Sequence, residues 1–308
     1  MKAVEYAQCG GPEVLALVTR PDPACGPGMV LVANEAVSVN PVDAKIRAGL
    51  YPGMPKRLPA GTGRDGAGVI QAVGAGVDPG RIGRRVCYLA QRGAPSWAER
   101  VVLPAEHAED VPDGLGPAEA ASLPLAGVSA WAGLVEAGGL AAGERVLIHA
   151  AAGGVGGLAV QIARALGATV WAVCSSPNAD HVSALGADHL ILRDRQAFEA
   201  ACDGMDLVFD LVGGETRARS RKVLRPSGRL VGLNALPFGT EHARADITER
   251  MAEVQPGTGA LRAVLDLVAA GRVRPDIGAV LPFSAYAEAH RRIETGRTRG
   301  KIVLTLPG

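Results

Sequence analysis

The sequence predicts an α/β fold in which a β-rich part is followed by a doubly wound parallel sheet. Residues 1–110 contain short alternating apolar runs broken by Gly and Pro, which is typical of strands joined by turns. From residue 145 onward, apolar runs alternate with helical patterns, which is typical of βαβ units and a parallel sheet. The last residues return to a strand pattern, so we expect the chain end to rejoin the first part.

Composition excludes several classes of protein. The chain has 308 residues, 48% of them apolar, so we expect one or two domains with substantial cores. A formal net charge of +1 gives no broad attraction to nucleic acid or to an anionic membrane. The uncharged run 120–135 contains Pro124 and is too short to span a bilayer. We expect no signal peptide, and the five cysteines, with no CxxC pair, favour a reducing, cytoplasmic location.

The β-rich part contains four runs that we expect to form strands, and turn residues separate them: 29–40, 67–77, 83–89 and 97–104. Residues 104–121 are polar and rich in turn formers, so a domain boundary is expected near their end. We therefore divide the chain into a first domain over 1–118, a second over 119–257 and a final segment over 258–308 that returns to the first.

The second part contains five apolar runs that we expect to form parallel strands: 145–150, 169–174, 189–193, 206–212 and 229–234. Their nearly continuous apolar character fits burial on both faces of a sheet. After them, a periodic helix over 258–273 is expected to end at Gly271, and a second helix is expected over 285–297. A closing strand is expected over 300–307.

A glycine-rich loop joins the first of these strands to a helix. Gly153 would let the backbone approach a pyrophosphate, and Gly156 would let the helix pack tightly on the strand. Ala151 stands where the dinucleotide fingerprint has its first glycine, and a small residue serves there if its φ stays negative. The strand before and the helix after favour a cofactor loop over a plain connection. The expected contacts are Ala152, Gly153, Gly154, Val155 and Gly156.

The end of the second strand indicates which dinucleotide is bound. A site for NAD usually carries Asp or Glu there, whereas this strand ends in Cys174, Ser175 and Ser176. A rim without a carboxylate would not repel a 2′-phosphate, and Arg193 ends the next strand. We therefore predict NADPH as cofactor, with Ser175 and Arg193 as contacts. Two alternatives stay open, because Ser176 also fits a helix N-cap and Arg193 could simply be solvated.

The chain resembles the medium-chain dehydrogenase/reductase superfamily, and within it the zinc-free quinone oxidoreductases related to zeta-crystallin. The resemblance covers nearly the whole chain and lies in 38–51, 58–77, 186–191, 298–304 and the loop positions Ala150, Gly153 and Gly156. It implies a GroES-like catalytic domain built from both chain ends and a Rossmann domain between them. It also implies NADPH-dependent reduction of a quinone or an α,β-unsaturated carbonyl (an enone), and a homo-oligomer of two or four subunits.

The resemblance also bears on zinc. Zinc-dependent relatives carry Cys near the position of Ser38 and Gly-His-Glu where this chain has Gly63, Arg64 and Asp65. Catalytic zinc takes about three protein ligands, and the six histidines show no ligand spacing, so we predict no metal. Many relatives that use NADPH have Lys near the position of Asn178. Its absence here weakens the prediction of NADPH, and the presence of Arg193 partly restores that prediction.

By the same resemblance, Asn40 and Tyr51 face the nicotinamide and the substrate. Tyr51 would donate a hydrogen bond or a proton, or else form an aromatic lid. Arg64 would add positive charge, unless it pairs with Asp65 or another acid. Ser129 matches a position near the nicotinamide, although a helix serine often bonds to its own backbone.

Three further cofactor contacts are expected at the ends of later strands: Val212, Gly213 and Asn234. Ligands of open α/β sheets bind at the carboxyl ends of the strands. Gly213 and the adjacent Gly214 also fit an ordinary turn between strand and helix. Lys301 follows Gly300 near the closing strand, and the sequence leaves it without an assigned role.

The substrate class stays open between two enzymatic functions. The first is reduction of a quinone or an enone, and the second is reduction of an enoyl thioester in fatty acyl or polyketide synthesis. No basic patch for a phosphopantetheine arm is evident in the sequence, which favours the first. A cofactor-binding protein without turnover is a third alternative.

Overall fold

The computed structural model describes residues 1–233 and 239–307, and these form two compact units. The first unit contains Met1–Leu125, Gln255–Leu265 and Pro275–Gly308, and the second contains Ala126–Val254 and Asp266–Arg274. Residues 266–274 thus belong to the second unit, whereas the sequence-based division placed them with the first. Side-chain hydrogen bonds explain the difference, because the Gln161 amide both accepts from the Arg274 N–H at 3.0 Å and donates to the Arg274 carbonyl at 3.1 Å.

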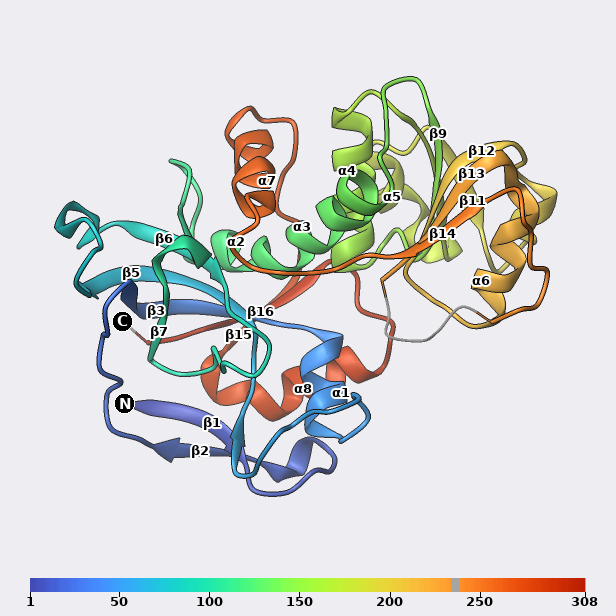
Figure 1. The fold of residues 1–308 in the computed structure, drawn as a ribbon. Coiled ribbons are helices and arrows are strands. Elements are labelled where there is room, and N and C mark those ends of the chain that lie inside the picture. Colours follow the sequence, from blue (N-terminus) through green and yellow to red (C-terminus); the bar gives the residue numbers. More distant parts are fainter. Residues whose placement is uncertain (234–238, 308) are drawn as a thin grey trace. The chain divides into compact units, whose positions relative to one another are not determined.

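The first unit contains two sheets (Figure 1). The smaller one has the order β2 (Leu15–Thr19), β1 (Lys2–Tyr6), β4 (Ala60–Gly61). The larger one has the order β15 (Ile277–Pro282), β16 (Lys301–Thr305), β3 (Met29–Val39), β5 (Asp65–Val73), β6 (Arg85–Leu89), β8 (Ala108–Asp110), and β7 (Arg100–Pro104) also pairs with β3. The closing strand β16 lies antiparallel to β3, with Ile302 opposite Val39, so the two ends of the chain share one sheet.

Helices of the first unit follow from local sequence signals. Helix α1 (Pro41–Arg47) begins after Asn40, with Pro41 at its first position and the Asp43 carboxylate accepting the Asn40 N–H. The others are α2 (Pro117–Ser122), α8 (Tyr286–Glu294) and the start of α7 (Ala260–Ala269), with short 3-10 turns at Pro12–Val14, Pro79–Arg81, Ala105–His107 and Phe283–Ala285. Gly271, the expected terminator after α7, has a positive φ of 68°.

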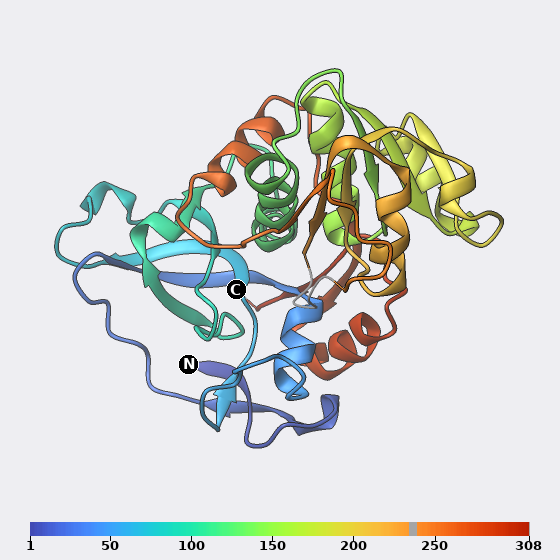
Figure 2. The ribbon, with the colours of Figure 1, turned by 45° about the vertical axis from the view of Figure 1, so that its right-hand side comes forward.

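Helices α1 and α8 are joined through a buried arginine, and they lie side by side in Figures 1 and 2. Arg47 is 1% exposed and donates to the Gly10 carbonyl at 3.0 Å, contacts His290 Nδ1 at 2.9 Å and pairs with Glu294. Burial and the nearby Arg47 charge lower the pKa of His290 to about 3, so the imidazole is neutral and accepts from Arg47. This cluster fixes the returning C-terminal segment against the N-terminal part of the same unit.

The second unit has a six-stranded sheet, and all its strand pairs are parallel. Its order is β11 (His189–Leu192), β10 (Thr169–Cys174), β9 (Arg145–Ile148), β12 (Met205–Asp210), β13 (Leu224–Gly232), β14 (Thr248–Met251). The chain runs outward from β9 to β11 and then returns to the other side of β9 with β12. The five expected runs form the first five strands, and β14 was missed because TERM carries no apolar run.

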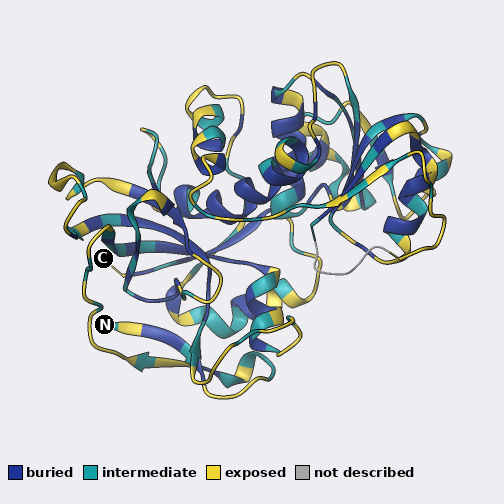
Figure 3. Ribbon diagram, in the orientation of Figure 1, coloured by how far each residue is buried: buried dark blue, intermediate teal, exposed yellow. Residues whose placement is uncertain are grey.

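Helices connect these strands. They are α3 (Pro124–Trp131), which starts in the first unit and continues into a π-turn at Ala132–Ala137, then α4 (Gly154–Ala165), α5 (Ala179–Ala184) and α6 (Glu215–Ser220), with 3-10 turns at Ser176–Asn178, Phe198–Ala200 and Arg221–Val223. Figure 3 shows that most of β9 and β12 is buried, as expected for strands covered on both faces. Within the described part of the chain, every helix is too short or too polar to cross a membrane.

Removing the Glu294 carboxylate tests the Arg47 cluster. Glu294→Ala would leave a buried guanidinium without its charge partner, and we expect the free energy of unfolding to fall by about 2 kcal/mol, since the Glu294 side chain is 34% exposed. Urea unfolding followed by circular dichroism measures the shift. The control is Glu288→Ala on the same helix, which removes exposed ion pairs with Arg291 and Arg292 and costs less than about 0.5 kcal/mol. Equal losses in both variants would contradict this account.

Candidate functional site

A buried polar network lies where β3 ends and α1 begins in the first unit. Asn40 is 3% exposed, and its amide donates to Asp65 Oδ1 at 2.8 Å and to Asp43 Oδ2 at 3.2 Å. The Ser38 hydroxyl donates to the same Asp65 oxygen at 2.7 Å, and the Leu125 N–H donates to the other oxygen at 2.9 Å. Asp65 therefore fixes Asn40 in one orientation through charge-assisted hydrogen bonds.

Lys301 belongs to this network, although sequence reasoning left it unassigned. The pairing of β16 with β3 brings its ammonium group to the Asn40 side-chain oxygen, and the Val39 carbonyl lies 3.3 Å away. Lys301 is 5% exposed, and burial lowers its pKa, while the negative charges of Asp65 and Asp43 act in the opposite direction. The signal that could have found it was the predicted return of the final strand to the first part of the chain.

Asp43 is the second carboxyl group of the network, and the sequence did not single it out. It is 2% exposed, and its oxygen accepts from both the backbone and the side-chain nitrogen of Asn40. Burial first, and then the negative charge of Asp65, raise the pKa of Asp43 to about 7. A group with this pKa holds a proton on part of the molecules at neutral pH, so it can give one up or take one.

Arg64 does not pair with Asp65, which answers the alternative that the sequence left open. It is 4% exposed, and its side chain donates to the Ala90 carbonyl from Nε at 3.3 Å and from a terminal nitrogen at 3.1 Å. Burial lowers the pKa of Arg64, the negative charges of Asp43 and Asp65 act in the opposite direction, and the Arg92 charge acts in the same direction as burial. Tyr51 is half-buried, and the Arg92 guanidinium lies 5.2 Å from the centre of its ring.

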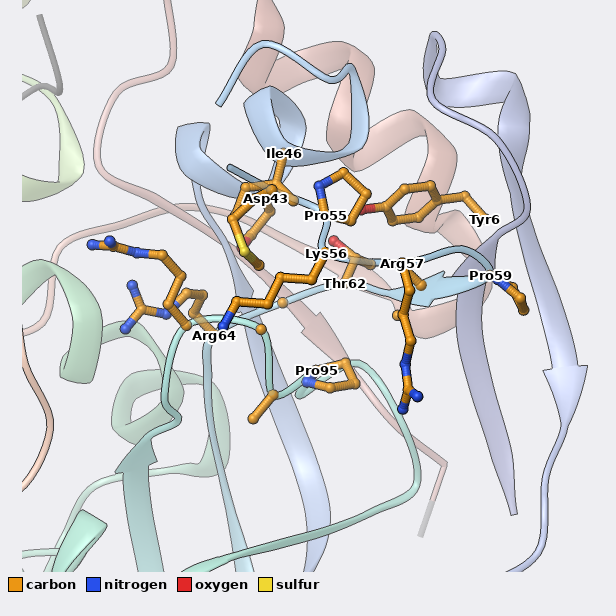
Figure 4. Close-up of a pocket in the computed structure, with 17 residues that line it drawn as sticks. Tyr6, Asp43, Ile46, Pro55, Lys56, Arg57, Pro59, Thr62, Arg64 and Pro95 are labelled. Carbon is orange, nitrogen blue, oxygen red and sulfur yellow. The ribbon is translucent and has the colours of Figure 1, made fainter. Parts of the chain in front are cut away.

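A cavity of about 530 Å³ lies in the first unit beside this network (Figure 4). Its polar lining includes Tyr6, Asp43, Lys56, Thr62 and Arg64, together with Arg92. Of the three predicted catalytic residues, only Arg64 lines it. Asn40 reaches the cavity indirectly through its hydrogen bond to Asp43, and Tyr51 contacts Arg92 on the cavity wall.

The glycine loop of the second unit has the geometry expected of a cofactor loop. Helix α4 begins at Gly154 with Gly153 as a cap that has no side chain, so its first N–H groups are available to an anion. A Cβ on Gly156 would lie 2.2 Å from the Ala150 carbonyl oxygen, so only glycine fits there. A Cβ on Gly153 would meet nothing nearer than that oxygen at 3.4 Å. The positive φ of 51° falls on Ala150 and not on Ala151.

The rim at the end of β10 contains a carboxylate, although the sequence predicted a rim without one. Ser175 lies there as expected, and its hydroxyl accepts from the Asn178 amide at 3.0 Å. A carboxylate is nevertheless present, because Asp194 accepts the Ser176 N–H at 2.8 Å, and that bond lowers the pKa of Asp194. Arg193 is exposed beside this rim, held by a 2.9 Å bond from its N–H to the Cys174 carbonyl, and pairs with no acidic side chain of the described residues.

The loop after β12 is organised by an ion pair that sequence reasoning missed. Asp210 accepts the N–H groups of Val212 and Gly213 at 2.9 Å each, and Arg217 Nε lies 2.6 Å from its other oxygen. Gly213 has a φ of 84°, which favours glycine. This carboxylate therefore fixes the two predicted cofactor contacts in the turn.

Two other predicted contacts complete the set. Ser129 is 4% exposed on α3, and no hydrogen bond of its hydroxyl to a described residue is found. Asn234 lies outside the described residues.

Among the described residues, no group of three or more His, Cys, Asp or Glu side chains is placed to hold a metal ion. The absence of a metal from the reaction stays a prediction.

Residues 26–113 match the family model described as alcohol dehydrogenase GroES-like domain, and residues 185–304 match the one described as zinc-binding dehydrogenase. The chain is 32% identical over 325 residues to the quinone oxidoreductase of Pseudomonas aeruginosa, which covers 98% of this chain and 99% of that protein.

The chain is 36% identical over 303 residues to polyketide synthase GfsB of Streptomyces halstedii, which covers 91% of this chain but only 5% of that protein. The structure of Escherichia coli quinone oxidoreductase complexed with NADPH aligns with 99% of this chain and 100% of its own, with a TM-score of 0.88 and 26% identity.

The expected GroES-like and Rossmann-like architecture is thereby confirmed. The chain belongs to the medium-chain dehydrogenase/reductase superfamily, in its quinone oxidoreductase branch, and is an oxidoreductase.

Proposed function

We propose that the protein reduces a quinone or an α,β-unsaturated carbonyl with NADPH. The observation that carries the proposal is the junction of β9 and α4, where Gly156 leaves no room for a side chain and the uncapped helix start presents free N–H groups. Residues Ala152, Gly153, Gly154, Val155 and Gly156 would hold the pyrophosphate. Val212, Gly213, Ser129 and Asn234 would lie along the nicotinamide half. When bound, the cofactor supplies the hydride.

The first unit would supply the polar groups that the reaction needs. Negative charge grows on the acceptor oxygen during the reduction, and fixed hydrogen-bond donors or cations stabilise it. Tyr51 and Arg64 are the proposed sources of a donor and of positive charge. Asn40, held by Asp65 and Lys301, would orient the reactants. Asp43 faces the cavity and would supply the proton that completes the reduction.

Reduction of an enoyl thioester is the second candidate function. The observation that favours it is the 36% identity to a segment of a polyketide synthase. The proposed homo-oligomer of two or four subunits is independent of this choice and is measured by light scattering.

A panel of acceptors tests the proposed function. We expect the purified chain to oxidise NADPH faster with a quinone or an enone than with crotonyl pantetheine thioester, as followed by the absorbance of NADPH. The reverse order would favour the thioester function. Tight binding of NADPH in calorimetry with no turnover of any acceptor would indicate a cofactor-binding protein.

The preference for NADPH is tested at Arg193. Arg193→Ala removes the free cation beside Ser175, and we expect KM for NADPH to rise by about tenfold while KM for NADH stays unchanged, because only NADPH carries the 2′-phosphate. Arg195→Ala, which removes an exposed cation two residues away, serves as the control. An equal effect of Arg193→Ala on both cofactors would show that Arg193 does not recognise the 2′-phosphate.

The proposed proton donor is tested by pH. A donor must be protonated, so the rate is expected to be full below pH 7 and to fall as pH rises through the pKa of Asp43 at about 7. Asp43→Asn keeps an oxygen acceptor for the Asn40 N–H but cannot titrate. We expect this variant to be at least about tenfold slower at pH 6 and to lose the fall above pH 7. A pH profile unchanged by the substitution would exclude Asp43 as the donor.

A further inference from the structure

The cavity of the first unit has a wall of cations with few acids to balance them. Lys56, Arg57, Arg64 and Arg92 all line it, and Asp43 is the one carboxyl group among the described residues that do so. None of these four cations forms an ion pair with an acid in the described ranges 1–233 and 239–307. Figure 4 shows the Lys56 side chain extending toward Arg64.

Arg64 is the buried member of this group. Two of its five N–H groups bond to the Ala90 carbonyl, and the others have no partner among the described residues. Burial lowers the pKa of Arg64 and the Arg92 charge acts in the same direction, whereas the negative charges of Asp43 and Asp65 act in the opposite direction. Buried N–H groups of a guanidinium that lack a hydrogen-bond partner are costly, so an anion that reaches them would stabilise Arg64.

A second, independent group in the cavity also lacks a partner. Tyr6 is 2% exposed, and its buried hydroxyl forms no hydrogen bond within the described part of the chain. Burial raises the pKa of Tyr6 to about 12, so the hydroxyl keeps its proton and can donate. Its ring points toward Pro55 at the cavity in Figure 4. An unsatisfied buried donor of this kind is expected to meet a ligand atom.

We propose that Lys56, Arg64 and Arg92 bind an anionic group, a carboxylate or a phosphate, on the acceptor substrate, with the Tyr6 hydroxyl as a further donor in the cavity. This inference rests on the proposed function, because it specifies which acceptors the same enzyme prefers. Arg is suited to both anions, since its planar fork matches two oxygens at once. The enzyme is therefore expected to prefer a quinone or an enone that carries an acidic group over its neutral counterpart and, under the second candidate function, a phosphate-bearing thioester over the unphosphorylated one.

Matched pairs of acceptors test the charge alone. One pair is a γ-keto-α,β-unsaturated acid and its methyl ester, and the other is crotonyl thioester of pantetheine and of phosphopantetheine. We expect kcat/KM to be about tenfold or more higher for the charged member of at least one pair. A preference for the acid alone identifies a carboxylate, and a preference for the phosphorylated thioester alone identifies a phosphate. Equal values within both pairs would overturn the proposal and leave the proposed function standing.

Substitutions assign the preference to the cations. Lys56→Gln and Arg92→Gln change exposed side chains, so both variants are expected to fold, and each should reduce the charged-to-neutral ratio by about threefold or more. Arg64→Gln should abolish it, and Arg64→Lys should restore it only in part, because the fork is lost. Lys45→Gln, which removes an exposed cation of α1 that is not among the residues lining the cavity, should leave the ratio unchanged. A ratio equally sensitive to Lys45→Gln would indicate a general charge effect and contradict the assignment.

Calorimetry separates this inference from the proposed function. If no acceptor is turned over, the proposed function fails, but binding of the acid and of its ester to the chain with NADPH still tests the anion site. Tighter binding of the acid, lost in Lys56→Gln and Arg92→Gln, would support the site. Equal affinity for acid and ester would overturn it.

Discussion

The antiparallel pairing of β16 with β3 is the constraint on which the polar site of the first unit depends. It places Lys301 at the Asn40 side chain, so residues separated by more than two hundred positions share one hydrogen bond. Without that ammonium group, two carboxyl groups would lie buried beside Asn40 with little compensation. The pairing thus determines both the order of the sheet and the charge balance of the network.

The network in turn determines what each acid can do. Asp65 accepts hydrogen bonds from Ser38, Asn40 and the Leu125 N–H, which satisfies both of its oxygens. Among the described residues, Asp43 accepts hydrogen bonds from Asn40 alone, and burial first and then the nearby Asp65 charge raise its pKa to about 7. The two acids differ in their environment and not in their chemistry, and this difference favours a positioning role for Asp65 and the proposed proton-transfer role for Asp43.

Strands and helices could be predicted where one segment contains the whole signal. The parallel strands from 145 to 232 and the terminator Gly271 are of this kind, because apolar runs and glycine act locally. Lys301, Asp43 and the Asp210–Arg217 pair could not be predicted, because their roles come from neighbours that only the fold supplies. The Ser175 rim shows the same limit, since the carboxylate that enters it comes from Asp194 beyond the next strand.

The cationic wall of the cavity could not be predicted from the sequence either, because the fold brings its residues together. Lys56, Arg64 and Arg92 are separated in sequence, so no basic patch is evident there, and the net charge of the whole chain is only +1. A local excess of positive charge can exist in a nearly neutral protein when acids are paired elsewhere, as Asp210 is with Arg217 and Glu294 with Arg47. Unpaired cations around a concave surface attract an anion more strongly than the same cations on an open surface, because the low-dielectric walls focus the field. Net charge is therefore a poor guide to the substrate, and the balance of charges within the cavity is the quantity that selects it.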